Sequence, residues 1–326
     1  MMLTAHPSGD AFDVVTIGRS SVDIYPLQTG VGIEDVETFG KFLGGSPTNV
    51  AVAASRLGSR ARVVTAVGAD PFGSFVRREL TRLGVDVAGI LTLPGVATSV
   101  AFCELFPPDD FPLYFYRATP SPELRLRVED LDLQAIEQAR ILWVTATGLS
   151  LEPSLAAHQA ALDARAGATT ILDLDYRACF WDRPEDAAAA VQAVLPQVSV
   201  AVGNLQECEV AVGESDPERA ASALLESGVE IAIVKQGPRG VLALTADERV
   251  EVAATPCVVV NGLGAGDAFG GALCHGLLSG WDLHRTITFA SAAGAIVASR
   301  LECSTAMPSR GEIDRVLALG HVPEGM

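Results

Sequence analysis

The chain has 326 residues, of which 49% are hydrophobic and 19% are charged, so it can bury a large core in one large domain or two smaller ones. Its 40 acidic residues outnumber its 23 basic residues and give a net charge of -17, which argues against nucleic acid or an anionic membrane surface as a partner. An anionic small molecule could still bind, but it would need locally placed arginines and a metal ion.

No segment indicates secretion or membrane insertion. Residues 1–9 lack the basic region and apolar stretch of a signal peptide. The longest uncharged run, residues 187–206, contains Pro196, Gln197 and Asn204 and is interpreted as a helix followed by a buried strand. The six cysteines and five histidines show no metal-ligand spacing, so we expect reduced thiols and a cytoplasmic protein.

Strands and helices are predicted to alternate along most of the chain. In order they are strand 14–17, helix 49–57, strand 62–67, helix 72–83, strand 141–145, helix 153–166, strand 169–173, helix 185–195, strand 198–202, helix 217–226 and strand 231–235. Such alternation favours an α/β fold, a doubly wound, mainly parallel sheet with helices on both faces.

Two segments interrupt this alternation. Residues 24–43 and 97–117 are strand-like without intervening helices, and the second is interpreted as a hairpin that turns at residues 107–110. Together they predict a small β-sheet over one edge of the main sheet. We therefore expect one domain over residues 12–320, with a disordered terminus at 1–11 and a tail at 321–326.

The most informative segment is the glycine turn at residues 262–271. It follows the apolar run 257–260, interpreted as a strand, and precedes a helical pattern, so backbone N–H groups would form an anion site at a helix N-terminus. Asp267 is the one acid in the turn, and it could accept a proton from a nucleophile that attacks phosphorus. Two alternatives stay open: a dinucleotide-binding turn of a nicotinamide oxidoreductase, or a plain turn with a capping Asp.

Two motifs in this order carry a family resemblance. With Gly264-Ala265-Gly266-Asp267 late and Gly44-Gly45-Ser46-Pro47-Thr48-Asn49 early, the chain resembles the ribokinase-like (PfkB) sugar kinases from about residue 13 to about residue 319. The resemblance implies a doubly wound α/β domain with a β-sheet lid, ATP and Mg²⁺ as cofactors, and transfer of the γ-phosphoryl group of ATP to a sugar hydroxyl.

Three further elements narrow the resemblance. Residues 18–25, 172–177 and 299–308 look like those of family members that phosphorylate 5-dehydro-2-deoxy-D-gluconate at its 6-hydroxyl in myo-inositol breakdown. The Asp175-Tyr176-Arg177 element is shared with 2-dehydro-3-deoxygluconate kinases, so such a kinase or a fructokinase is the nearest alternative. A non-catalytic sugar-acid-binding regulator is the alternative of a different class, although the glycine turn and its acid are intact.

The resemblance gives the late motif its catalytic role. Asp267 matches the base that takes the proton of the sugar hydroxyl, and the backbone N–H groups of Gly264, Ala265 and Gly266 match the anion hole for the moving phosphoryl group. In a loose transition state, positioning and charge stabilisation dominate. Asp267 could otherwise be only an N-terminal cap.

The early motif matches the sugar-binding residues. Gly44 and Gly45 match glycines that let the backbone approach the sugar, and Asn49 matches a polar sugar contact. Asp23 matches an acid at the end of the first strand that holds sugar hydroxyls, although taken alone it could be a turn residue.

A third group matches the nucleotide and metal residues. Asn204 and Glu207 match an N-x-x-E element that orients Mg²⁺, its waters and the phosphates, and Mg²⁺ keeps several waters. Glu207 could instead be a first-turn acid that complements the helix dipole. Lys235, Gly237 and Gly240 match a loop along the nucleotide, and Lys235 could also be a solvated strand end.

Substrate class depends on two arginines. Arg117 and Arg177 each follow a tyrosine, and in kinases of keto-deoxy sugar acids arginines at comparable places hold the carboxylate. Arg177 could instead pair locally with Asp173 or Asp175, and Arg117 could be a charge at the hairpin edge.

The chain departs from the family at one place. Asn261 and Gly262 stand where many members have Asp-Thr in a monovalent-cation site, so activation by K⁺ is left open. Family members often dimerise through the lid, and a homodimer of this kind is also expected.

Overall fold

The computed structural model describes residues 11–165 and 167–326. Within them, nine strands form one sheet in the order β13-β12-β11-β10-β9-β8-β1-β4-β5. The strands from β5 to β11 in this order run parallel, while β12 and β13 are antiparallel at one edge. Their bounds are β1 Val14–Ile17, β4 Ala61–Gly68, β5 Ile90–Leu93, β8 Ile141–Thr145, β9 Thr170–Asp173, β10 Val200–Asn204, β11 Ile231–Lys235, β12 Val241–Leu244 and β13 Arg249–Val252.

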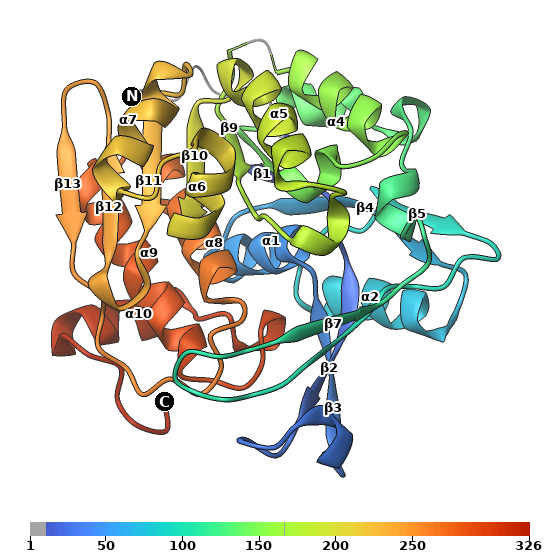
Figure 1. The fold of residues 1–326 in the computed structure, drawn as a ribbon. Helices are drawn as coiled ribbons and strands as arrows, with labels where there is room; N and C mark the ends of the chain where they lie inside the picture. Colours follow the sequence, from blue (N-terminus) through green and yellow to red (C-terminus); the bar gives the residue numbers. More distant parts are fainter. Residues whose placement is uncertain (1–10, 166) are drawn as a thin grey trace.

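Helices cover both faces of this sheet (Figure 1). One face packs against α1 Ser46–Arg56, α2 Pro71–Arg82, α8 Ala265–Leu278, α9 Leu283–Ala298 and α10 Arg310–Leu319. The other packs against α3 Leu133–Gln138, α4 Ser154–Asp163, α5 Pro184–Val194, α6 Leu205–Val212 and α7 Pro217–Glu226. Successive residues of β8 alternate between the two cores, since Ile141 and Trp143 join the first and Leu142 and Val144 the second. The fold is therefore the expected α/β class, a two-sided, mainly parallel sheet.

The predicted elements are observed with ends shifted by a few residues. The helix expected at 153–166 is α4, whose predicted last residue lies outside the described residues. The strand expected at 257–260 is wrong, because this segment is a loop. Its last residue, Val260, donates its N–H to the carbonyl of Ala298 at the end of α9, as does the next residue, Asn261, so the apolar run follows a helix end instead of pairing with the edge strand β13.

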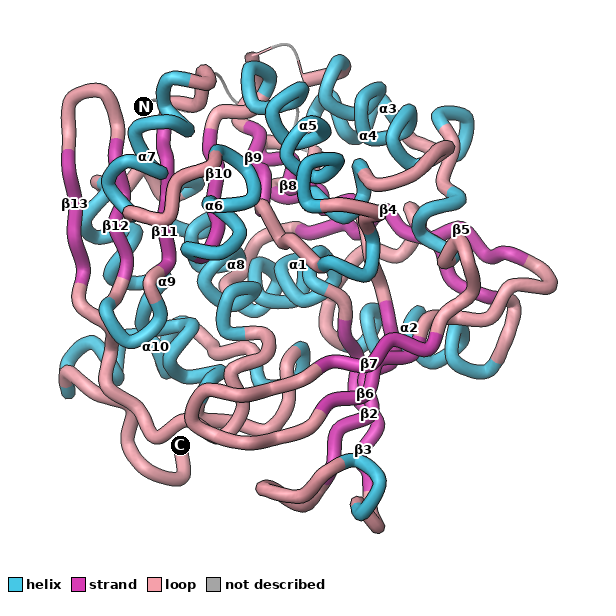
Figure 2. Tube along the Cα trace, viewed as in Figure 1, coloured by secondary structure: helices cyan, strands magenta, loops and turns pink. Residues whose placement is uncertain are grey.

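The two segments without helices form a separate sheet in the order β3-β2-β6-β7 (Figure 2). Its strands are β2 Ser21–Pro26, β3 Phe39–Gly44, β6 Val100–Cys103 and β7 Leu113–Tyr116, and β6 and β7 are the expected hairpin. Side chains alternate across it, so Asp23, Ala101 and Phe115 share one face, while Phe102 and Tyr116 lie on the other. The hairpin turn reaches the main domain, where a Cβ on Gly262 would lie 2.9 Å from the Phe111 ring.

The topology determines where a site can form. The chain leaves β1 toward β4 on one side and later fills β8 on the other, so β1 is the point at which the strand order reverses. Crevices at the carboxyl ends of parallel strands beside such a point are the usual ligand sites of this architecture.

No helix in the described part of the chain is long and apolar enough to cross a membrane.

Candidate active site

The glycine turn begins α8. Gly264 is the residue before the helix, and its φ of 81° lies in the left-handed region that favours glycine. A Cβ at Gly264 would also lie 2.7 Å from Sγ of Cys303. Ala265, Gly266 and Asp267 form the first turn, where backbone N–H groups have no partner within the helix. This end of α8 therefore offers N–H donors and the positive end of the helix dipole to an anion.

Asp267 is held in this turn by a residue of another helix. Nδ2 of Asn49, in the first turn of α1, donates a hydrogen bond to Oδ2 of Asp267 at 2.7 Å. The hydroxyl of Ser304 in turn donates to Oδ1 of Asn49, which leaves the amide N–H₂ directed at the carboxylate. Burial raises the pKa of Asp267 to about 6, against the lowering effect of hydrogen bonds from Asn49 and Ser46. The carboxylate is therefore ionised at neutral pH yet a stronger base than a solvated one.

Asp267 faces a cavity of about 760 Å³ between the main domain and the small sheet. Thirteen of the predicted site residues line it: Asp23, Gly45, Asn49, Arg177, Asn204, Glu207, Lys235, Gly237, Gly240, Gly264, Ala265, Gly266 and Asp267. Two predicted residues, Gly44 and Arg117, are not among the lining residues.

The small sheet supplies one wall through Asp23. This residue lies within β2 rather than at the end of the first strand, which corrects the expected position. Its carboxylate accepts hydrogen bonds from Ser21 Oγ at 2.8 Å and Tyr25 OH at 2.6 Å, while burial raises its pKa. Gly44 lies opposite in β3, and a Cβ there would lie 2.1 Å from the Asp23 carboxyl group. Gly44 thus makes room for Asp23, while Gly45 lines the cavity.

The carboxyl ends of β9, β10 and β11 bring charged groups together. Burial, together with the carboxylates of Asp175 and Glu207, raises the pKa of Asp173 to about 8. Burial alone would lower the pKa of Lys235, but Asp173, Glu207 and Asp267 together raise it. Lys235 is therefore a cation held among carboxylates inside the cavity, not a solvated strand end.

Asn204 and Glu207 form a capping box at the start of α6. Oδ1 of Asn204 accepts from the Glu207 N–H at 2.9 Å, and Oε2 of Glu207 accepts from the Asn204 N–H at 2.7 Å. Oε1 of Glu207 lies 3.6 Å from Nη1 of Arg177. The buried Glu207 carboxylate thus closes the helix end with one oxygen and leaves the other toward the cavity and Arg177.

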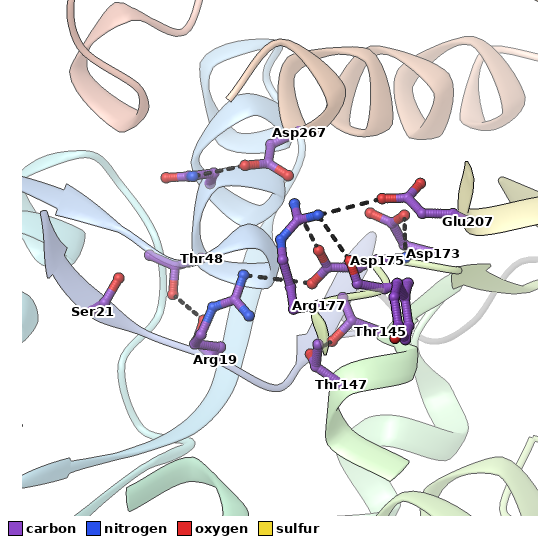
Figure 3. Close-up of polar contacts among 12 residues, drawn as sticks. Arg19, Ser21, Thr48, Thr145, Thr147, Asp173, Asp175, Arg177, Glu207 and Asp267 are labelled. Atoms are coloured by element: carbon purple, nitrogen blue, oxygen red, sulfur yellow. Dashed lines mark hydrogen bonds and ion pairs between the residues drawn. The ribbon is translucent and has the colours of Figure 1, made fainter. Parts of the chain in front are cut away.

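The two predicted arginines have different environments. Arg177 pairs with Asp175 at 3.0 Å (Figure 3), the local pairing that the sequence left open, and Asp175 and then Glu207 raise its pKa. Arg117 lies away from the main cavity, where it donates to the carbonyl of Cys179 at 2.8 Å and lies 3.6 Å over the Phe180 ring. Arg177 therefore lines the main cavity, whereas Arg117 lines an adjoining cavity that Arg177 also lines.

Another part of the cavity wall surrounds the turn between β11 and β12. Gly237 and Gly240 lie in the turn between β11 and β12, and both have positive φ, 58° and 95°. A Cβ at Gly240 would lie 2.1 Å from the carbonyl of Val252. Beyond this turn the wall becomes mostly apolar, through Val241, Ala254, Cys257, Val259, Ala295 and Ala298.

Sequence reasoning missed several polar residues of the site, among them Asp173, Asp175, Arg19 and Ser304. Arg19 follows the end of β1 and lines the cavity with its side chain only 8% exposed. Ser304 fixes the orientation of Asn49 from 255 residues away. A charged residue directly after a buried strand was a usable signal for Arg19, whereas nothing local marks Ser304.

Comparison with known proteins gives one consistent result. The family model described as pfkB family carbohydrate kinase matches residues 11–310. The chain is 33% identical to a 5-dehydro-2-deoxygluconokinase of Photobacterium profundum, over 91% of this chain and 92% of that protein. It is 30% identical to the enzyme of the same name from Geobacillus thermodenitrificans, over 94% and 93%.

Solved structures share the fold along nearly the whole chain. An E. coli protein with a provisional ribokinase II assignment, solved with ATP and Mg²⁺, superposes with a TM-score of 0.86 at 27% identity, over 94% of this chain and 99% of that one. A Vibrio cholerae fructokinase double mutant with fructose, ADP and potassium bound gives 0.83 at 26%, over 95% and 100%.

Proposed function

The chain belongs to the pfkB family of carbohydrate kinases, and from this membership we propose that it transfers the γ-phosphoryl group of ATP to the 6-hydroxyl of 5-dehydro-2-deoxy-D-gluconate. We assign this step to myo-inositol breakdown. Relatives named for this activity are 30–33% identical over more than nine tenths of the chain. The observation that carries the proposal is the place of Asp267, a carboxylate of raised pKa in the first turn of α8 that faces the shared cavity.

The residues of the site suit the chemistry of phosphoryl transfer. Asp267 takes the proton of the attacking hydroxyl as the new O–P bond forms, and ADP leaves with the electron pair of the broken O–P bond. The N–H groups at the start of α8 stabilise the charge on the transferred group. Lys235 adds a cation close to this turn, since a Cβ on Gly266 would lie 3.1 Å from its Nζ.

The charge of the cavity fits ATP with Mg²⁺. Asp173, Asp175, Glu207 and Asp267 face one cavity with Lys235 among them, and the raised pKa of Asp173 reflects burial and their mutual repulsion. A divalent cation relieves such repulsion, and Mg²⁺ is usually held by one or two carboxylates, its waters and phosphates. We assign Glu207 as its protein contact, and the ion supplies charge neutralisation on the phosphate oxygens.

The substrate assignment is tested with a panel of sugars. Purified protein is assayed for ATP-dependent phosphorylation of 5-dehydro-2-deoxygluconate, 2-dehydro-3-deoxygluconate and fructose, and kcat/KM is compared. We expect the first to exceed the others by at least tenfold. Preference for either of the other sugars would reassign the substrate within the family, and no transfer to any sugar acid would contradict the sugar-acid proposal.

The structure also supports a proposal that K⁺ is not required. Asn261 is fully buried, donates its Nδ2 to the Leu301 carbonyl at 2.7 Å and accepts the Leu263 N–H at 3.0 Å. A neutral amide committed in this way provides no anionic ligand for a cation. We expect kcat in sodium buffer to match that in potassium buffer, whereas a severalfold K⁺ stimulation would contradict this.

We propose that the small sheet is a lid and that its outer face pairs with a second copy. Phe39, Phe102 and Tyr116 stack edge to face on that side, and Phe39 and Tyr116 are exposed. A continuous aromatic strip of this kind is typical of a contact surface. Light scattering should give twice the chain mass, and Tyr116→Glu should shift it toward the monomer. A wild-type monomer at micromolar concentration would contradict the proposal.

A further inference from the structure

The sugar end of the cavity contains a cation that the pairing of charges does not account for. Arg177 has two carboxylate partners, Asp175 at 3.0 Å and Glu207 at 3.6 Å. Arg19 has one ion-pair contact, from its Nη2 to Asp175 at 3.5 Å. That carboxylate is the one that Arg177 approaches more closely, and the buried carboxyl groups of Asp23 and Glu123 interact with Arg19 without forming an ion-pair contact.

Arg19 is also poorly satisfied in its hydrogen bonds. Its side chain is 8% exposed, and among the described residues its buried Nη1 has no hydrogen-bond partner. The nearby buried carboxyl group of Glu123 is hydrogen-bonded by Ser121 at 2.7 Å instead. Burying a guanidinium is costly unless its donors are paired, so this arrangement favours an additional anion.

The surroundings hold Arg19 in a fixed position. Its guanidinium lies 5.7 Å from the centre of the Phe115 ring and 5.5 Å from that of Phe180. Its carbonyl accepts a hydrogen bond from Thr48 at 3.2 Å and packs against Gly45, where a Cβ would lie 2.5 Å away. Phe115 belongs to the cavity face of the small sheet, so the lid itself positions this arginine.

We propose that Arg19 binds the carboxylate of the sugar-acid substrate and thereby determines the preference for sugar acids over neutral sugars. This inference rests on the proposed function and deepens it. Arg19 lines the same cavity as Asp23, which can accept hydrogen bonds from sugar hydroxyls, and as Asp267, which receives the hydroxyl to be phosphorylated. Asp175 makes only a long ion-pair contact with Arg19 (Figure 3). When the substrate carboxylate replaces Asp175 as the partner of Arg19, Asp175 can stay paired with Arg177.

Electrostatics explain why a buried arginine suits this role. The net charge of -17 repels an anionic sugar at long range, so recognition must come from donors at contact distance. A guanidinium offers a carboxylate two parallel N–H donors, which a hydroxyl cannot use in the same way. Losing one charge-assisted contact weakens binding by about ten- to a hundred-fold.

The test compares two sugars in Arg19→Gln, Arg19→Lys and wild type. For 5-dehydro-2-deoxygluconate we expect Arg19→Gln to raise KM about ten- to a hundred-fold, with kcat changed less than threefold, and Arg19→Lys to recover part of the loss. For fructose, kcat/KM should change less than threefold. Calorimetric titration of the sugar acid should show the same loss in affinity without turnover, while ATP affinity stays unchanged.

The controls separate this role from a structural one. Arg78→Gln removes an arginine of α2 whose side chain is 67% exposed, and it should not discriminate between the two sugars. Equal losses on both sugars in Arg19→Gln, or an unchanged KM for the acid, would overturn the role of Arg19 while leaving the kinase assignment intact. A wild-type protein that phosphorylates fructose but neither binds nor phosphorylates the acid would overturn the role of Arg19 and the proposed sugar-acid substrate together.

Discussion

Asn49 and Asp267 lie 218 residues apart in sequence, and Nδ2 of the first donates a hydrogen bond to Oδ2 of the second at 2.7 Å. The contact joins the first turns of α1 and α8, the two helices that carry the early and the late glycine motifs. The amide has a fixed orientation because Ser304 donates to its oxygen. The position and the basicity of the Asp267 carboxylate therefore depend on residues from three separate segments.

Replacing Asp267 by Asn should stop turnover and spare nucleotide binding. A positioned base contributes about 10²–10⁴-fold, so kcat of Asp267→Asn should fall by at least that range. Backbone groups and Lys235 remain to hold the phosphates, so ATP affinity measured by calorimetry should change less than threefold. Near-normal turnover in this variant would contradict the assignment of Asp267 as the base.

The same substitution should stabilise the protein in a pH-dependent way. Burial raises the folded-state pKa of Asp267 to about 6, above its ordinary value, so its contribution to stability is full in acid and is lost as the pH rises through about 6. Asp267→Asn has no such loss. Its melting temperature should match that of wild type near pH 4 and exceed it at pH 7. A lower melting temperature at pH 7 would contradict the burial of this charge.

The pH dependence of kcat/KM should show the same ionisation of Asp267. Because Asp267 must be ionised to act as a base, kcat/KM should fall as the pH decreases through about 6. Ser304→Ala frees the Asn49 amide to turn, weakens the hydrogen bond that lowers the Asp267 pKa, and should move this acid limb to higher pH. Ser299→Ala removes a hydroxyl that donates to the Ile296 carbonyl, so this variant is the control and should leave the limb in place. An identical profile in both variants would show that Ser304 has no such influence.

Glu207 offers a test of the magnesium assignment. Glu207→Gln keeps an acceptor oxygen for the capping box at Asn204 but removes the charge. We expect the Mg²⁺ concentration for half-maximal rate to rise about tenfold, with little change in sugar KM. Glu209→Gln, an exposed acid on the same helix, should change neither quantity. Weaker sugar binding with unchanged Mg²⁺ dependence would place Glu207 on the sugar side.

Gly44 should affect the sugar without affecting the nucleotide. A Cβ here would lie 2.1 Å from the Asp23 carboxyl group, so Gly44→Ala must displace Asp23. We expect sugar KM to rise at least tenfold while the KM for ATP changes less than twofold. Gly311→Ala is the control, since Gly311 in α10 has open space around its Cα and ordinary φ. If Gly44→Ala leaves sugar KM unchanged, Asp23 does not hold the sugar.

Much of the site was predictable from the family resemblance, which singled out Arg177, Asn204 and Lys235. These residues line the cavity with the glycine turn because they lie at or just after the ends of β9, β10 and β11, parallel strands that end at one edge of the sheet. The apolar run 257–260 was wrongly predicted to be a strand, because hydrophobicity alone does not show whether a neighbouring strand has a free edge with which the segment could pair. It lies against the end of α9 instead.

The features that the sequence did not predict concern side-chain direction and contacts between residues far apart in the chain. Arg117 is two residues after Phe115, so strand alternation would put both toward the cavity, but β7 ends at Tyr116 and Arg117 turns to Cys179. Arg19 meets Asp175 across 156 residues, and Ser304 meets Asn49 across 255. Such pairings depend on how complete layers pack, which no local pattern encodes.

The alternation along β6 and β7 links the cavity to the aromatic outer face of the small sheet. Ala101 and Phe115 face the cavity, whereas Phe102 and Tyr116 face outward. Deleting one residue within either strand would reverse every side chain beyond it and destroy both surfaces together. Insertions at the turn around residues 107–110 would reverse no side chain of the strands, but Pro108 and Asp109 in that turn also line the cavity. Over evolutionary time, the two strands of the hairpin should therefore keep a constant length.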